Sequence, residues 1–276
     1  MSTIVVTIGS AARRAHLEVQ QTVLARSGVR RVVVWLDDSP PPGLTADELV
    51  SVPPGPHGLR LAAARNAGAD RALEAGASLI VFLDADCVPS SDLLDRYAAA
   101  ADAELDAVLC GPVTYLPPGV DALDEQELRR HRAPHAARPD PADHSLLRAP
   151  PSDYPLFWSL SFALSAERWR SGPRFDEAYE GYGGEDTDFA FHLRERDVPL
   201  VWVGRADAYH QHHSTSSSPV QHLDDILRNG RLFAERWGEW PMTGWLREFE
   251  RQGLVSRDGD GWRLGASTAS GARPGG

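Results

Sequence analysis

Short hydrophobic runs alternate with longer amphipathic stretches through the first part of the chain. The run that ends at Asp84 is continuously apolar, which is typical of a strand covered on both faces. This alternation predicts an α/β fold with a doubly wound, mostly parallel sheet flanked by helices. The expected strands cover residues 4–8, 31–36, 79–84 and 106–116, and the expected helices cover residues 14–27, 59–75 and 91–102.

Acidic residues follow two of these strands at the point where each strand ends. Asp38 follows the second strand, and Asp84 and Asp86 close the third. Carboxyl ends of parallel strands share one edge of a sheet, where ligands bind, so we expect these carboxylates to face a common crevice. Their oxygens suit a divalent cation held together with a phosphorylated ligand. The alternative is that Asp84 and Asp86 only cap the next helix.

The segment 117–153 shows no periodicity and contains many prolines, arginines and histidines. It is long for a loop inside a compact domain, which favours a mobile lid or an acceptor-binding segment. An insertion without function is the alternative.

The second half of the chain contains Gly183-Gly184-Glu185-Asp186 at the start of an expected helix that runs to about residue 196. Acids in a first helical turn often only complement the helix dipole, but the preceding glycine pair would expose them at the floor of a pocket.

A strand over 200–203 then leads to His210, His212 and His213, and an imidazole could complete a metal shell begun by the aspartates. Residues two apart share a face of an extended segment, so we expect His210 and His212 to point towards the metal and His213 to point away, with His210 preferred.

Helical periodicity resumes at residue 219, with a further helix over 243–252, and the tail 265–276 is expected to be disordered. The net charge of -11 argues against binding to nucleic acid or to anionic membranes. No run of about 18 apolar residues and no signal peptide is present, which predicts a cytoplasmic protein without an integral membrane segment.

Taken together, these features resemble the GT-A glycosyltransferases of the family 2 group. The second half resembles the catalytic region shared by β-1,4-galactosyltransferases and polypeptide N-acetylgalactosaminyltransferases. The resemblance covers about residues 3–240 and rests on four elements in order along the chain: Ala64-Arg65-Asn66-Ala67-Gly68, Asp84-Ala85-Asp86, Gly183-Gly184-Glu185-Asp186 and a later histidine, best matched by His210.

The resemblance implies a GT-A (nucleotide-diphospho-sugar transferase) fold and a role for each matched residue. Mn²⁺, or Mg²⁺ as second choice, would be held by Asp86, Asp84 and His210. Asp186 would be the catalytic base, and Glu185 would orient the acceptor. The residues implied in binding the nucleotide-diphosphate sugar are Thr7, Asp38, Arg65, Asp84, Gly183 and Gly184.

The resemblance also implies one domain over residues 1–264, with a nucleotide-sugar half up to about residue 116 and an acceptor half from about residue 154. Tyr182 stands where the galactosyltransferases carry tryptophan, which leaves the acceptor open. Aspartate at the end of the Gly-Gly-Glu-Asp stretch favours inversion, because the retaining polypeptide transferases carry Glu-Asn there.

The leading hypothesis is therefore a metal-dependent, inverting transfer of a sugar from a nucleotide-diphosphate sugar to a hydroxyl acceptor. Two alternatives stay open. A sugar-phosphate nucleotidyltransferase would need a triphosphate loop, for which residues 9–14 are a faint candidate. The other alternative is a non-catalytic module that binds a sugar nucleotide.

Overall fold

The computed structural model describes residues 1–213 and 219–265, and most of the expected tail lies outside these ranges. The chain forms two compact units. Unit 1 comprises residues 1–181 and 185–214, and unit 2 comprises residues 182–184 and 215–276. The single domain expected over residues 1–264 stays a prediction.

An eight-stranded sheet forms the centre of unit 1, in the order β3-β2-β1-β4-β9-β6-β10-β8. The neighbours are parallel from β3 to β4 and again between β6 and β10, whereas β9 and β8 run antiparallel to their neighbours. The predicted α/β fold with a mostly parallel sheet is confirmed. The strands are β1 (Thr3–Gly9), β2 (Arg30–Trp35), β3 (Glu48–Ser51), β4 (Leu79–Asp84), β6 (Val108–Cys110), β8 (Leu146–Arg148), β9 (Ser161–Ser165) and β10 (Leu200–Val203).

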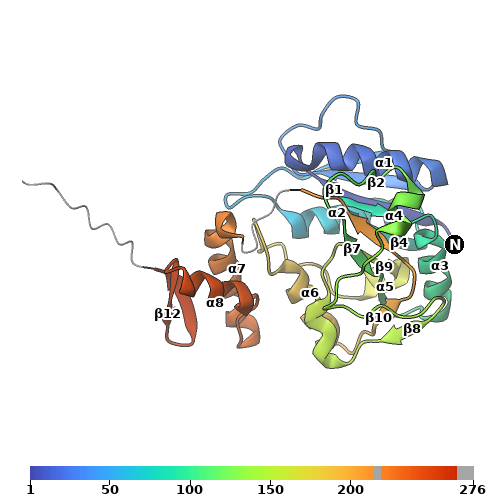
Figure 1. Ribbon diagram of the computed structural model, residues 1–276. Coiled ribbons are helices and arrows are strands. Elements are labelled where there is room, and N and C mark those ends of the chain that lie inside the picture. Colours follow the sequence, from blue (N-terminus) through green and yellow to red (C-terminus); the bar gives the residue numbers. More distant parts are fainter. Residues whose placement is uncertain (214–218, 266–276) are drawn as a thin grey trace, which may run out of the picture. The chain divides into compact units, whose positions relative to one another are not determined.

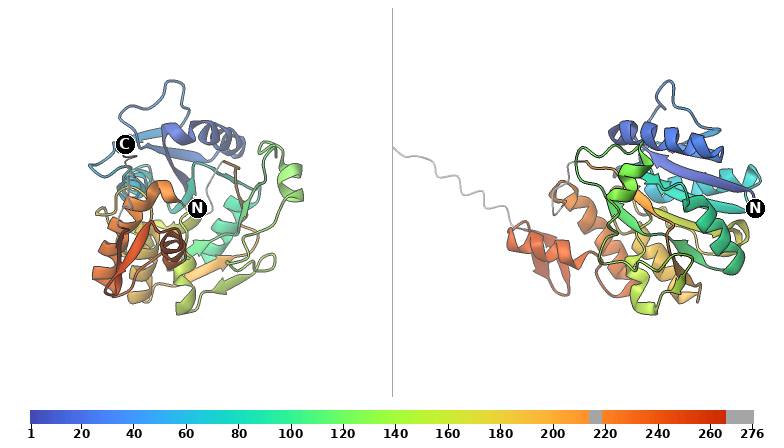
Figure 2. Two further views of the ribbon diagram at one scale, coloured as in Figure 1. Left: turned by 60° about the vertical axis from the view of Figure 1, so that its left-hand side comes forward. Right: turned by 45° about the vertical axis from the view of Figure 1, so that its right-hand side comes forward.

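Helices cover both faces of this sheet, as Figures 1 and 2 show from three sides. Alternating strand residues face opposite layers: Val6 packs with α2 and α6, whereas Val5 packs with α1 and α3. The helix α1 ends at Gly28 in a left-handed conformation, as its sequence predicts. The helices are α1 (Arg14–Ser27), α2 (Leu61–Glu74), α3 (Leu93–Ala103), α5 (Ala166–Ser171) and α6 (Glu185–Glu195), and the 3-10 turn η1 (Ala11–Arg13) precedes α1.

A second, three-stranded sheet in unit 1 has the order β5-β11-β7. Its strands are β5 (Cys87–Pro89), β7 (Val113–Tyr115) and β11 (Ala208–His210). The single strand expected over 106–116 is wrong, because the chain breaks at Gly111-Pro112 into β6 and β7, which join different sheets. Proline cannot donate a ladder hydrogen bond, which explains a break at this point.

The segment 117–153 contains regular structure, contrary to expectation. It includes α4 (Glu125–Arg130) and β8, and η2 (Pro151–Leu156) begins at its end. The side chain of Asp124 caps α4, and Arg132 pairs with both Asp140 and Asp207. Whether the segment moves as a lid stays a prediction. Among the described residues, no helix has both the length and the apolar character needed to cross a membrane.

Unit 2 is built from two helices and a hairpin around a small core of its own. Both helices were predicted, but the hairpin was not, although Gly259-Asp260, the two residues that join its strands, are typical of a hairpin turn. The elements are η3 (Val220–His222), α7 (Leu223–Trp237), α8 (Thr243–Arg251), β12 (Val255–Asp258) and β13 (Gly261–Leu264).

Candidate active site

Three side chains suited to metal binding meet where β4 ends and the small sheet begins. Because β11 pairs antiparallel with β5, His210 lies opposite Cys87, and the backbone N–H of Gln211 donates to the carbonyl of Asp86 at 2.7 Å. The Oδ2 atom of Asp86 lies 3.5 Å from Nε2 of His210 and 3.4 Å from Nε2 of His213. One ligand atom from each residue lies within 4.8 Å of the others.

The partner of His210 in this cluster differs from the sequence prediction. We expected His212 to point inwards and His213 to point away, and the structure shows the reverse. The strand β11 ends at His210, so the two-residue alternation does not continue beyond it. His212 is exposed, and its carbonyl oxygen lies 3.3 Å from Nε2 of His16, whereas the His213 side chain is only 13% exposed.

The pKa values of Asp86 and His210 favour the protonation states that bind a metal. Burial alone would raise the pKa of Asp86, but His213, His210 and Arg13 outweigh it and lower the pKa to about 2. Burial lowers the pKa of His210. An ionised carboxylate and a neutral imidazole are the forms that bind a cation, so the lowered pKa values of Asp86 and His210 fit a divalent metal.

Arg13 was named from the sequence only as part of residues 9–14, the faint candidate for a triphosphate loop, and not as a neighbour of the metal site. Its Nε donates to Oδ2 of Asp86 at 3.2 Å, and its terminal nitrogen lies 3.3 Å from Nδ1 of His213. The side chain is 37% exposed. Its place directly after the first strand, at the ligand-binding edge of the sheet, is the signal that could have identified it.

A second charged group surrounds Arg65 on α2. The buried guanidinium donates to Oε1 of Glu185 at 3.0 Å and to Oδ1 of Asp84 at 3.2 Å. Burial alone would lower the pKa of Arg65, but Asp84 and Glu185 raise it, so the arginine stays charged. Asp84 therefore pairs with Arg65 and lies outside the Asp86 cluster, because the chain turns immediately after β4.

The charge of Asp86 in the first cluster acts on Asp84 in the group around Arg65. Burial, opposed by Arg65, raises the pKa of Asp84 to about 6, and the negative charges of Asp86 and Glu185 add to this effect. A positive charge that entered the site would favour the ionised form of Asp84. The role of Asp84 as a metal ligand stays a prediction.

Asp186 lies in the first turn of α6 and is partly exposed. Its Oδ1 accepts a hydrogen bond from the backbone N–H of Thr187 at 2.7 Å. Burial, followed by the neighbouring charge of Glu185, raises its pKa to about 7. A carboxylate with this pKa exchanges protons readily near neutral pH, which is the property that a general base needs.

Thr7, predicted to bind the donor, is buried on β1 behind the site. Its hydroxyl donates to Oε1 of Gln20 at 2.9 Å. The amide nitrogen of Gln20 donates in turn to the carbonyls of Asp84 and Cys87, each at 2.7 Å. Gln20, which the sequence reasoning missed, thus fixes the backbone on either side of Asp86. The structure does not bring the Thr7 side chain to the carboxylates.

The other predicted donor-binding residues lie at the ends of elements. Asp38 is exposed just beyond β2. Gly183 and Gly184 belong to unit 2 and have φ angles of 88° and 96°, which favour glycine. The carbonyl of Gly183 accepts a hydrogen bond from Asn229 at 2.8 Å. The binding roles of these three residues stay predictions.

Comparison with protein families and curated sequences points to one enzyme class. Residues 32–143 match the family model for glycosyl transferase family 2. The validoxylamine A glucosyltransferases of Streptomyces hygroscopicus subsp. jinggangensis (strain 5008) and subsp. limoneus are each 28% identical to the chain over 197 residues. The matches cover 62% of this chain but only 45% and 42% of those proteins, so the chain spans less than half of each relative.

Solved structures show the same fold at low sequence identity. GalNAc-T7, crystallised with UDP, GalNAc and Mn²⁺, has a TM-score of 0.59 and 15% identity over 86% of this chain and 48% of its own. S. aureus TarS also has a TM-score of 0.59, with 14% identity over 92% of this chain and 45% of its own. TarS 1–349 in complex with UDP-GlcNAc has a TM-score of 0.52 and 13% identity, over 91% of this chain and 73% of its own.

Proposed function

We propose that this chain, which has the GT-A fold, is a family 2 glycosyltransferase that transfers a sugar from a nucleotide-diphosphate sugar to a hydroxyl acceptor, with a divalent cation and with inversion. The observation that carries the proposal is the cluster of Asp86, His210 and His213 at the carboxyl end of β4. The UDP and Mn²⁺ present in the GalNAc-T7 structure support this choice of ligands.

The cation would be held by Asp86, His210 and His213. One carboxylate and two imidazoles suit Mn²⁺ better than Mg²⁺, which prefers oxygen ligands. When bound, the cation supplies positive charge against the leaving diphosphate. Arg13 now compensates the charge of Asp86, and we infer that it contacts the diphosphate when the metal replaces it.

Asp186 would accept the proton of the acceptor hydroxyl as the hydroxyl oxygen attacks the anomeric carbon and the bond to the diphosphate breaks. Its raised pKa of about 7 places it near the range where a general base is most effective. Glu185 would orient the acceptor, because Arg65 fixes its carboxylate. A single base and a single displacement invert the anomeric configuration.

Asp84 would orient Arg65 and, once the cation is bound, could serve as a further oxygen ligand. Asp38, Gly183 and Gly184 would contact the nucleotide and the sugar. These assignments follow the motif order and the exposed place of Asp38 beyond β2.

Calorimetric titration with UDP-, GDP- and dTDP-sugars in the presence of Mn²⁺ tests the proposal. We expect binding of one donor that is abolished by EDTA and by Asp86→Ala, and retained in the exposed control Asp106→Ala. A ligand at about 100 times its Kd stabilises the protein by about 2.7 kcal/mol, so a thermal shift gives a parallel readout.

Two outcomes would contradict the proposal. Binding that is undiminished in Asp86→Ala and insensitive to EDTA would exclude the metal site. Release of pyrophosphate from a nucleoside triphosphate and a sugar phosphate would instead indicate a nucleotidyltransferase, an alternative that the sequence matches do not favour.

A further inference from the structure

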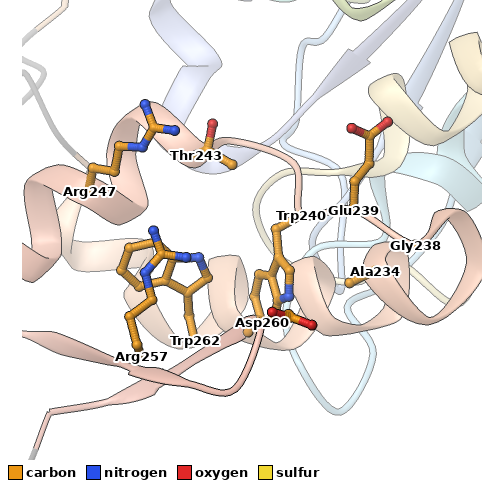
Figure 3. A pocket seen from close by; sticks show the side chains of 10 residues that line it. Ala234, Gly238, Glu239, Trp240, Thr243, Arg247, Arg257, Asp260 and Trp262 are labelled. Carbon is orange, nitrogen blue, oxygen red and sulfur yellow. The ribbon is translucent and has the colours of Figure 1, made fainter.

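A cavity of about 310 Å³ lies entirely within unit 2, among α7, α8 and the β12–β13 hairpin. Figure 3 shows that its walls combine two indoles with side chains of both charges. The residues that matter here are Trp240, Trp262, Glu239, Asp260, Arg247 and Arg257. Apolar surface with a few convergent polar groups is the usual composition of a small-molecule site.

The aromatic wall is held rigidly. A Cβ atom at Gly230, in the middle of α7, would lie 2.7 Å from Cζ3 of Trp240, and one at Gly261 would lie 3.1 Å from its Cζ2. Glycine in a helix interior costs about 1 kcal/mol relative to alanine, so Gly230 is explained by the close approach of this indole. The guanidinium of Arg257 stacks over Trp262 at 3.8 Å from the ring centroid, which fixes the second indole and the arginine together.

Three of the charged side chains in the wall have no hydrogen bond or ion pair to any described residue: Glu239, Arg247 and Asp260. Such groups are often only solvated, but here all three line the same cavity as the partly exposed Trp240. Both arginines lie to one side of this indole in Figure 3. The two acids balance the two arginines, so the lining has no net charge and repels neither sign preferentially.

We propose that this cavity binds a neutral saccharide of one or two pyranose rings. A pyranose has an apolar C–H face that packs on an indole and a rim of hydroxyls that both donate and accept. Carboxylates only accept and guanidinium groups only donate, so Asp260 and Arg247 together satisfy neighbouring hydroxyls. Glu239 and Asp260 would repel an anion in this cavity, and Arg247 and Arg257 would repel a cation.

The inference rests on the proposed function only for the role of the bound saccharide, because a glycosyltransferase binds saccharides as acceptors. Binding in unit 2 requires neither the metal nor the donor, because the cavity contains none of the residues of the candidate active site. The two proposals can therefore fail separately.

Calorimetry and saturation-transfer NMR on the full chain, with maltose as the probe, test the inference. We expect a millimolar Kd that rises about tenfold in Arg247→Gln and in Asp260→Asn, each of which removes hydrogen bonds to a charged group. Both side chains are exposed and unpaired among the described residues, so neither change should unfold unit 2. The matched control is Arg263→Gln, on β13 but outside the cavity, which should bind maltose as the wild type does.

Three outcomes separate the possibilities. Maltose binding that persists in Asp86→Ala supports a saccharide site independent of the metal site. Binding of inorganic phosphate that is stronger than that of maltose and sensitive to Arg247→Gln would overturn the neutral-saccharide assignment. Failure of the wild-type protein to bind maltose would also refute it, as would a maltose Kd in Asp260→Asn and Arg247→Gln that equals the wild-type Kd.

Discussion

Replacing Asp186 by asparagine should make the protein less active and more stable. The substitution keeps the shape of the side chain and the oxygen that accepts from Thr187. It removes the ability to take a proton, and loss of a general base costs about 10²–10⁴-fold in turnover. It also removes a carboxylate whose pKa is raised in the folded state to about 7, from an ordinary value of 3.8.

The stability gain depends on pH in a defined direction. As pH rises from about 4 to about 7, the unfolded chain ionises Asp186 before the folded protein does, so the wild type loses stability across this range. At 1.36 kcal/mol per pKa unit the full loss is at most about 4 kcal/mol above about pH 7. The favourable interaction with the helix dipole that asparagine gives up is smaller, about 0.3–1 kcal/mol.

Thermal unfolding of both proteins at about pH 5 and about pH 8 measures this effect. The advantage of the variant should grow by up to about 2–3 kcal/mol between the two conditions, or about 5–10 °C in Tm. Wild-type kcat/KM, followed by release of nucleoside diphosphate, should fall about tenfold per pH unit below about 7. The exposed Asp106→Asn should change neither quantity. A variant with wild-type turnover, or with an advantage independent of pH, would refute the role of Asp186.

Three further predictions concern the charges around the site. His213→Ala should weaken Mn²⁺ binding at least about tenfold in calorimetry while His212→Ala leaves it unchanged, and the opposite order would contradict the observed cluster. Arg13→Met should bind Mn²⁺ about fivefold more tightly without nucleotide, because it removes a positive charge that competes with the metal for Asp86. The energy of this competition is at most about 4 kcal/mol, and the 37% exposure of the Arg13 side chain reduces it to about 1 kcal/mol. Unchanged affinity would exclude this competition. Arg65→Met should lower the free energy of unfolding by about 3–5 kcal/mol in urea, because Glu185 stays buried without its partner, and a stable variant would show that the pair is dispensable.

The contribution of the sequence is clearest where the signal is local. Continuous apolar runs predicted the central strands, and their alternation with helices predicted the mostly parallel sheet that the structure confirms. The order of Asp84-Ala85-Asp86, Gly183-Gly184-Glu185-Asp186 and His210 was enough to indicate the enzyme family that the sequence comparisons support.

Predictions from local periodicity were wrong where the chain passes from one sheet to another or changes direction. The strand expected over 106–116 is divided between two sheets, and the alternation that favoured His212 stops with β11 at His210. The hairpin in unit 2 was missed because its strands are short, although its turn residues were visible.

The sequence by itself determined which kinds of side chain end the strands, and therefore that carboxylates and imidazoles are available to a metal and a phosphorylated ligand. Only the tertiary structure decided how they group: Asp86 with His210 and His213, and Asp84 with Arg65. The physical reason is that period and propensity act between neighbours along the chain. Which distant side chains meet depends on the register between strands, such as β5 against β11, and on the turns that follow them.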